Sequence, residues 1–301
     1  MYLNCHTAFS FKYGTLQVED IFNEAKRCGV HKLILTEINN TASYIEMLRL
    51  CAEKAPVNGS NLTAFGKEAY ELEIAVGVEF RNEDRLLFIA IAQNNDGFEE
   101  INRFLSYHNL NNKALPDRAP VFENVFVIYP FGLLEPDLLR SNEFLGVRVH
   151  QVNHLRLYQP YKTHTAKFVI HHPVTFANKI HFNVHRLLRS IDKNTLLSKL
   201  AEEQQALPNE IMMPERKLAG MFSDYPDLIE NTQQLMNGCS IDFELKTDKN
   251  KKTLTGSEES DWDLLVTKAW EGFSDRYDVS QPDLRERFQR ELNIIKSKGF
   301  C

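Results

Sequence analysis

The sequence predicts an α/β fold in which a mostly parallel sheet is covered by helices. Up to residue 182, short strand-like segments that are apolar along their whole length alternate with amphipathic helical segments. Strands of this kind are typical of sheets that are buried on both faces. The chain has 301 residues, of which 43% are hydrophobic, so it can bury one large core and carry a smaller appended part.

The first segment, residues 1–40, predicts a strand, a helix and a second, parallel strand. Apolar residues from Val18 to Ala25 recur at helical spacing, and Gly29 is placed to end that helix. Further along we expect a helix at 43–55 with Ile45, Leu48 and Ala52 inward, followed by a break at 56–61. A strand hairpin is expected next, at 73–80 and 86–92, and then a helix at 97–108. The last expected strands are 124–129, 144–149 and 167–174.

Only helices are expected from residue 183 onward. Val184, Leu187, Leu188 and Ile191 form the apolar face of one of them. Its basic side should face solvent, with contact to DNA or to another domain as the alternative; this side carries Arg186, Arg189 and Lys193. The charged run 248–252 indicates a boundary near residue 245. Other expected amphipathic stretches are 214–235, 257–273, 264–276 and 284–298.

The opening strand has a polar face that could line a site. Asn4 and His6 alternate with Leu3 and Cys5, so in an extended segment the polar pair shares one face and the apolar pair shares the other.

Two short motifs carry a resemblance to a known family. Residues 3–7 (Leu-Asn-Cys-His-Thr) and 36–38 (Thr-Glu-Ile) resemble the His-x-His and Thr-Asp-His motifs that open the polymerase and histidinol phosphatase (PHP) domain. The resemblance implies a distorted (β/α)7 barrel, which fits the number of expected strands. At both motifs this sequence departs from the pattern: Asn4 replaces a histidine, Glu37 an aspartate and Ile38 a histidine.

The rest of the chain is similar to bacterial DNA polymerase III alpha subunits. The stretches that carry this similarity are 77–80, 185–191 and 291–300. The resemblance covers essentially the whole chain. It implies a PHP-like barrel domain at 1–245 and, at 246–301, the helical start of the polymerase palm region.

The PHP resemblance also implies a cluster of metal ions at the carboxyl ends of the strands, where histidines and carboxylates would activate water for attack on phosphate. His6 and Glu79 match ligand positions of the family, and Glu37 keeps a carboxylate. Asn4 offers only a weakly coordinating amide oxygen, and Ile38 cannot bind metal.

Two further ligands are absent from the expected site. The family's late Asp-x-His motif falls on residues 173–175, so Pro173 and Thr175 stand at ligand positions. Since losing even a supporting partner of a ligand typically weakens a metal site about 10- to 100-fold, we expect no multinuclear cluster, no catalytic residue and no cofactor in this chain. A single weak zinc or manganese site formed by His6, Glu79 and His171 is the alternative.

Without a cluster, the remaining site residues should form a polar cluster of their own. We expect His6, Glu37 and Glu79 to converge in one cavity, where a charged His6, the Asn4 amide or a basic residue such as Arg81 compensates the carboxylates. Ile38 should be buried among apolar neighbours.

The function implied by the resemblance is that of the N-terminal PHP part of a polymerase III alpha subunit with a mainly structural role. Its expected partners are the remainder of the polymerase chain and a separate proofreading exonuclease subunit. Nucleotidyl transfer with magnesium would use palm carboxylates expected beyond Cys301. A metal-dependent phosphoesterase or 3′–5′ exonuclease is the alternative, and a small-molecule phosphatase such as histidinol phosphatase ranks last.

Composition excludes several other classes of protein. A net charge of −6 and a pI of about 6.0 do not suit a domain that mainly grips phosphate backbones, so DNA contact is expected only through a larger polymerase. The five cysteines include no Cys-x-x-Cys pair, which argues against a disulfide framework or zinc knuckle. No leader and no membrane-length apolar run is visible, so we expect a cytoplasmic protein without membrane contact.

Overall fold

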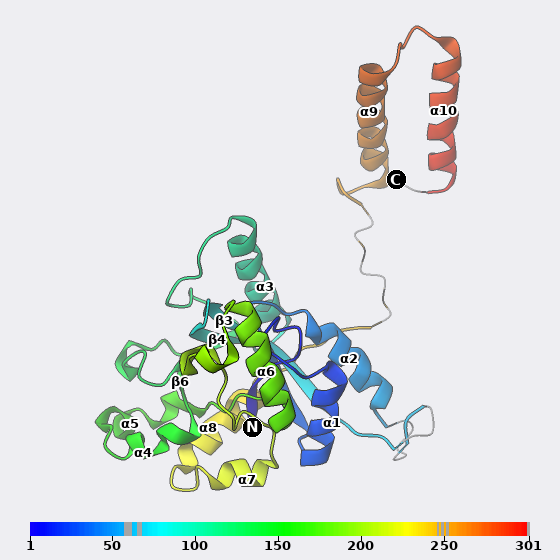
Figure 1. The fold of residues 1–301 in the computed structure, drawn as a ribbon. Helices are drawn as coiled ribbons and strands as arrows, with labels where there is room; N and C mark the ends of the chain where they lie inside the picture. The colour runs from blue at the N-terminus through cyan, green and yellow to red at the C-terminus, as the bar shows by residue number, and fades with distance from the viewer. Residues whose placement is uncertain (57–61, 65–67, 246, 248–249, 251–252, 300–301) are drawn as a thin grey trace. The chain divides into compact units, whose positions relative to one another are not determined.

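The computed structural model describes residues 1–56, 62–64, 68–245, 247, 250 and 253–299. The chain divides into two compact units, Met1–Phe243 and Glu244–Cys301, which Figure 1 shows in the colours of the chain order. All the strands of the described residues belong to the first unit.

The first unit is built on one seven-stranded sheet whose strands lie side by side in chain order. The first three strands are mutually parallel and so are the last three, whereas β4 runs antiparallel to both of its neighbours. The expected hairpin is therefore confirmed. The strands are β1 (Tyr2–Cys5), β2 (Lys32–Ile38), β3 (Glu73–Asn82), β4 (Arg85–Ala92), β5 (Val125–Pro130), β6 (Glu143–Val147) and β7 (Phe168–Ile170).

The two edges of this sheet are joined just after β7. Cys5 and Val174 form a parallel bridge. The His6 N–H donates to the Val174 carbonyl at 2.8 Å, and the Val174 N–H donates to the Asn4 carbonyl at 2.9 Å. The sheet thus closes into a distorted barrel, which confirms the expected fold class.

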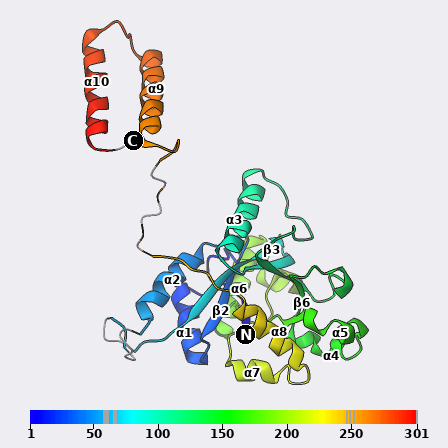
Figure 2. The ribbon, with the colours of Figure 1, turned by 180° about the vertical axis from the view of Figure 1, so that it is seen from behind.

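Helices surround this barrel, as the two opposite views in Figures 1 and 2 show. Those of the first unit are α1 (Val18–Cys28), α2 (Ser43–Lys54), α3 (Asn95–Leu110), α4 (Val152–Leu155), α5 (Gln159–Thr163), α6 (Lys179–Asp192), α7 (Glu215–Gly220) and α8 (Pro226–Asn237), with 3-10 turns at Pro136–Leu138, Val149–Gln151, Thr165–Lys167, Leu197–Lys199 and Glu202–Gln204. The stretch 214–235, expected as one helix, is two helices, and Pro226 begins the second.

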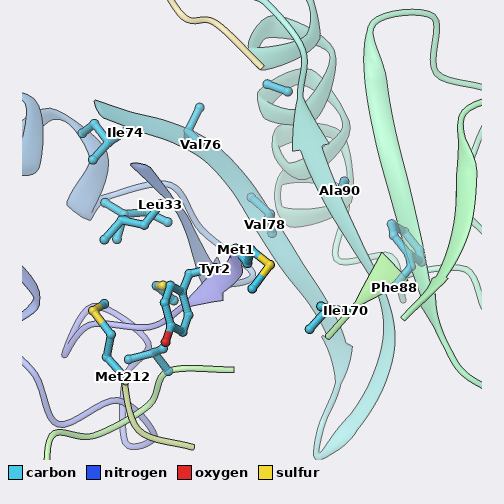
Figure 3. Packing of buried hydrophobic residues seen from close by; sticks show 14 of the residues in the cluster. Met1, Tyr2, Leu33, Ile74, Val76, Val78, Phe88, Ala90, Ile170 and Met212 are labelled. Carbon is cyan, nitrogen blue, oxygen red and sulfur yellow. The ribbon is translucent and has the colours of Figure 1, made fainter. Parts of the chain in front are cut away.

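Alternation along the strands sorts the core into an outer and an inner face. On β3, Val76 and Val78 belong to the outer cluster beneath the helices, part of which Figure 3 shows. Ala75 belongs to a smaller inner cluster, together with Leu235 and Met236 of α8. Every second residue of a strand therefore points into the barrel, and this parity decides which polar residues can meet there.

The first two helices test the expected apolar faces. In α1 the predicted residues are buried, and Gly29 ends the helix with φ 67°, the left-handed conformation that glycine adopts readily. In α2 Ile45 and Leu48 are half-buried and pack against the core as predicted, but the prediction is wrong for Ala52, which is exposed, and the most deeply buried apolar residues are Tyr44 and Met47. Residues 57–61 of the expected break lie outside the described residues.

The expected orientation of α6 is inverted. Val184, Leu187 and Ile191 are exposed, whereas His185 and Arg189 are buried. Arg189 is not on a solvated basic face, because its guanidinium forms ion pairs with Asp84 and Asp192. The polar contacts on the opposite side of α6, and not its apolar pattern, therefore determine which side of the helix is buried.

The second unit is a hairpin of two helices, α9 (Glu258–Arg276) and α10 (Pro282–Ser297). Ser257 caps α9 by accepting a hydrogen bond from the Ser260 N–H at 3.2 Å. Phe273 and Phe288 pack with ring centroids 4.7 Å apart. That this unit begins a palm region stays a prediction. Among the described residues, none of the helices is long and apolar enough to span a membrane.

Candidate functional site

Glu79 lies at the centre of a polar cluster inside the barrel. It occupies the inner face of β3 and is completely buried. Its Oε2 accepts a hydrogen bond from Asn4 Nδ2 at 2.8 Å and lies 3.1 Å from His6 Nε2. Asn4 also donates to Thr36 Oγ1 on β2 at 3.0 Å. Side chains from three neighbouring parallel strands thus meet where those strands end.

Arg81 reaches the same carboxylate from the other side. It stands two positions beyond Glu79 on β3, and its Nε donates to Glu79 Oε1. The guanidinium carbon lies 4.3 Å from the centre of the Tyr13 ring, and Nη2 donates to the Tyr13 hydroxyl at 3.1 Å. A cation against an aromatic face is stabilised by the ring's charge distribution, so Tyr13 helps to hold Arg81 in place.

This arrangement keeps Glu79 ionised although it is buried. Burial opposes ionisation, but the charges of Arg81 and His6 outweigh it and hold the pKa of Glu79 well below its usual range. Burial likewise raises the pKa of the Tyr13 hydroxyl to about 12. Tyr13 is therefore a neutral hydrogen-bonding group at neutral pH.

His6 connects this cluster to a second buried carboxylate. Its Nδ1 lies 3.2 Å from Thr175 Oγ1, and Thr175 Oγ1 in turn donates to Glu210 Oε2 at 2.7 Å. Because the Thr175 hydrogen points to Glu210, Nδ1 must be the donor toward Thr175, while Nε2 faces the Glu79 carboxylate. An imidazolium satisfies both contacts, since each ring nitrogen then donates.

His171 and Pro173 follow β7 and border a small cavity together with Arg148 and Glu210. His171 and Pro173 are both buried. Burial first, and then the charge of Arg148, hold the pKa of His171 well below its usual range, so its imidazole is neutral. Among the described residues, His171 Nε2 and Asn4 Oδ1 are buried without a hydrogen-bond partner.

Glu37 does not join this cluster. Thr36 points into the barrel, so its neighbour Glu37 points outward toward α2. There its carboxylate accepts hydrogen bonds from the Thr7 N–H at 3.1 Å, from the hydroxyls of Thr7 and Ser10, and from Ser43 Oγ at 2.6 Å. The expectation that Glu37 converges with His6 and Glu79 is therefore wrong, because the pleat of β2 separates them.

Ile38 is only half-buried, contrary to the expectation of full burial. It packs against the small apolar cluster of Tyr13, Phe176 and Ala206, and it also lines a cavity at the barrel mouth. Its side chain therefore seals the edge of the site without being enclosed.

His185 of α6 uses both of its ring nitrogens in hydrogen bonds. Nδ1 donates to the Tyr13 carbonyl at 2.7 Å, and Nε2 accepts from the Ala206 N–H at 2.8 Å. Burial lowers the pKa of His185 to about 4. This histidine joins α6 to two loops and has no ring nitrogen free to bind a ligand.

A cavity of about 420 Å³ opens above Arg81. Its charged walls are largely paired: Arg189 Nη1 contacts Asp192 at 2.9 Å and Lys193 contacts Asp84 at 2.6 Å. The cavity is lined by Phe11, Tyr13, Ile38, Arg81, Glu83, Asp84, Arg189, Asp192 and Lys193.

Both carboxylate oxygens of Glu79 are engaged by neighbouring side chains of the barrel. Arg81 occupies one oxygen of Glu79, and Asn4 with His6 occupies the other. Glu37 faces the opposite side of the sheet. Within the described parts of the chain, no three His, Cys, Asp or Glu side chains are grouped to hold one metal ion. Whether the protein binds a single ion stays a prediction.

Sequence reasoning named Arg81 but missed three contributors. Glu210, Tyr13 and Arg148 lie in connecting segments, and their roles depend on tertiary contacts such as the Arg148–Glu210 ion pair at 3.1 Å. Tyr13 follows the first motif closely, and an aromatic residue there was the one available signal. Glu210 lies in no motif.

Comparison with known proteins agrees with this fold. A PHP domain matches residues 3–131. Over its whole length the chain is 22% identical to DNA polymerase III subunit alpha of Bacillus subtilis (strain 168) and 20% identical to an error-prone DNA polymerase of Symbiobacterium thermophilum. It is also 27% identical over 139 residues to DNA polymerase III subunit alpha of Neisseria meningitidis, covering 43% of this chain and 12% of that protein. The chain spans only 28% and 30% of the first two relatives.

Proposed function

Since this chain carries a PHP domain and resembles the N-terminal part of DNA polymerase III alpha subunits over its whole length, we propose that it is a structural PHP domain of a replication polymerase in which Arg81 takes the place of metal ions. The observation that carries this proposal is the buried contact of Glu79 with both Arg81 and His6.

Electrostatics supports the substitution. Two like unit charges about 4 Å apart repel each other by roughly 4 kcal/mol at the effective dielectric constant of a protein. A divalent ion bound to Glu79 would lie beside the Arg81 guanidinium and would meet about twice that repulsion. Arg81 cannot relieve it by deprotonating, because Glu79 raises the pKa of Arg81 further although burial opposes this. Arg81 must therefore move away before a metal ion could use Glu79.

The proposed partner is the remainder of a polymerase chain, because the relatives are more than three times as long as the part that matches. Contact with DNA, and the magnesium that nucleotidyl transfer requires, would then belong to that larger protein. A proofreading exonuclease subunit is a second proposed partner, on the family resemblance alone.

A metal-dependent phosphoesterase or 3′–5′ exonuclease is the second candidate. It is favoured by one observation: His171 has a buried, unpartnered Nε2 in the barrel that also holds His6 and Glu79. A single zinc or manganese ion would need these three side chains.

One experiment distinguishes the two candidate functions. The purified chain is equilibrated with Mn²⁺ or Zn²⁺, its metal content is measured by elemental analysis, and it is incubated with 3′-labelled single-stranded DNA. The structural proposal predicts no stoichiometric metal and no degradation. Mn²⁺-dependent degradation that disappears in a Glu79→Gln variant would refute it and establish the phosphoesterase.

A further inference from the structure

One long stretch of the chain contains no carboxylate side chain. The chain has 41 aspartate and glutamate residues among 301, but none of them falls at residues 144–191. Seven histidines and seven lysine or arginine residues lie in the same stretch, which includes α4, α5 and most of α6. A chain of net charge −6 therefore contains a long segment whose own charge is positive.

The cations of this stretch differ in whether carboxylates from elsewhere neutralise them. Arg189 forms ion pairs with two aspartates, and Arg148 pairs with Glu210 at 3.1 Å. Arg156 and Lys162 are exposed, and within the described part of the chain their side chains form neither an ion pair nor a hydrogen bond. Unpaired positive charge therefore remains at the end of α4 and in α5.

The packing of α4 and α5 holds these two cations on the surface. Leu155 of α4 and Tyr161 of α5 are buried, and the Tyr161 ring lies 5.1 Å from the ring of Phe168 on β7. Arg156 and Lys162 follow these two buried residues directly in sequence. Figures 1 and 2 show α4 and α5 side by side on the outer side of the first unit. The exposed sides of the two helices thus form one surface.

Two exposed histidines extend this surface toward the end of β6. They are His150 and His154. Partial burial first, and then the charges of Arg148 and His154, lower the pKa of His150, so these three side chains are close enough to act on one another electrostatically. We call Arg148, His150, His154, Arg156 and Lys162 the α4–α5 basic surface.

The polar groups of this surface indicate which anion it fits. The side-chain amides of Asn153 and Gln159 are exposed between the cations, and arginine, lysine and neutral amides are the donors that hold phosphate and sugar oxygens of DNA. The rings of Tyr158 and Tyr161 pack against other rings of the fold, so they are not free to stack on unpaired bases. These features favour contact with a sugar–phosphate backbone over contact with the bases of a single strand.

Charge density favours a duplex over an acidic protein segment. Duplex DNA carries one negative charge per about 1.7 Å of its axis, whereas an extended peptide advances about 3.3 Å per residue and so has at most about half that density. A surface with few cations gains most from the denser polyanion.

We propose that the α4–α5 basic surface contacts the phosphate backbone of duplex DNA, independently of base sequence. The choice of DNA among polyanions rests on the proposed function, under which this chain is part of a DNA polymerase. Two carboxylates of the preceding turn limit the affinity: Asp137 pairs with His164 at 2.8 Å, and Glu135 accepts a hydrogen bond from Tyr158 at 2.9 Å. We therefore expect a dissociation constant of about 10⁻⁴ M at physiological salt, so this surface adds to the DNA contact of the longer protein.

Fluorescence anisotropy of a labelled DNA duplex, titrated with the purified full chain, tests this proposal. The titration is repeated between about 20 and 150 mM salt, because three phosphate contacts should strengthen binding more than about a hundredfold over this range. EDTA is present, so that no metal ion contributes. The wild type is compared with the double variant Arg156→Gln/Lys162→Gln.

The matched control is Arg49→Gln/Lys113→Gln, which removes the same two charges from exposed positions on α2 and after α3. Circular dichroism verifies that each variant is folded. The wild type and the control should bind alike. The Arg156→Gln/Lys162→Gln variant should bind at least about tenfold more weakly at low salt, and its slope of log affinity against log salt should be smaller by about two.

Three results would overturn the proposal. The first is a wild type that does not bind the duplex even at the lowest salt, and the second is a control that loses as much affinity as the α4–α5 variant. The third is polyglutamate that competes as well as unlabelled duplex at equal charge, which would assign the surface to an acidic protein. The metal and degradation assay tests the proposed function separately, so a chain that binds neither metal nor DNA would refute this inference alone.

Discussion

Glu79 and Arg81 are two residues apart on one strand and form an ion pair inside the barrel. They meet because residues i and i+2 of a strand share a face, so a single strand supplies both the buried anion and the cation that neutralises it. His6 adds a second contact to the same carboxylate from β1. The charge is thus balanced within the fold.

The first prediction is that Arg81→Met destabilises the protein by about 3–5 kcal/mol, since it leaves the Glu79 carboxylate buried with one partner fewer. Urea denaturation measures this loss. Adding Glu79→Gln to Arg81→Met should recover part of the stability, because the uncompensated charge is removed. Arg85→Met is the control: its ion pair with Asp117 is exposed, so the change should cost less than about 1 kcal/mol. Equal losses at both sites would contradict the role of Arg81.

The second prediction concerns pH. His185 is buried with a pKa near 4, whereas an unfolded histidine titrates near 6.5. Between these values the unfolded chain binds more protons, so this contribution to stability is complete above about pH 6.5 and is lost as pH falls toward about 4. The difference corresponds to about 3 kcal/mol.

Urea midpoints at several pH values across this window measure the effect. His171 and His172 contribute in the same direction, because burial lowers the pKa of each. A His185→Asn variant should be less stable at neutral pH and should lose less stability on acidification than the wild type. An unchanged slope in this variant would show that other groups dominate the acid response.

The strands were predictable because their signal is local. Apolar runs between polar turns specify β3 and β4 independently of the rest of the chain. The short charged turn between these two strands favours their antiparallel pairing. The closure of the barrel at Cys5 and Val174 depends on residues far apart in sequence, and it came from the family resemblance alone.

Faces were predicted less well than elements. The apolar row of α6 suggested its buried side, yet hydrogen bonds of His185 and ion pairs of Arg189 decide the orientation. Glu37 was grouped with Glu79 because both match family motifs, although its own neighbour Thr36 takes the inward position. Neighbouring residues of β2 point to opposite faces of the sheet, and this alternation separates Glu37 from the site. At β1 itself Asn4 and His6 do meet, but Leu3 and Cys5 belong to different apolar clusters.

The third prediction concerns the cost of truncating Ile38. For a fully buried isoleucine, replacement by alanine costs about 2–5 kcal/mol, but the Ile38 side chain is only partly buried in the folded state. Ile38→Ala should therefore cost about 1–2 kcal/mol. Ile101 on α3 is fully buried, and Ile101→Ala is the reference for the larger loss. Chemical denaturation of both variants measures the difference, and equal losses would show that Ile38 is enclosed in solution.

The last prediction separates a structural Glu37 from a metal-binding one. Its carboxylate accepts hydrogen bonds from Thr7, Ser10 and Ser43, which tie the loop after β1 to β2 and α2. In Glu37→Gln an amide nitrogen replaces one acceptor and faces donors, so the variant should lose about 1–3 kcal/mol.

Hydrogen exchange locates the effect of this change. The Ile38 N–H donates to Ser10 Oγ at 3.0 Å, so this amide and that of Thr7 should exchange faster in Glu37→Gln. Ser43→Ala removes one donor and leaves the carboxylate intact. This variant should therefore lose less stability than Glu37→Gln, and its Thr7 amide should exchange as slowly as in the wild type. If Glu37 were instead a metal ligand, Glu37→Gln would lower the metal content while stability in the presence of a chelator stayed unchanged.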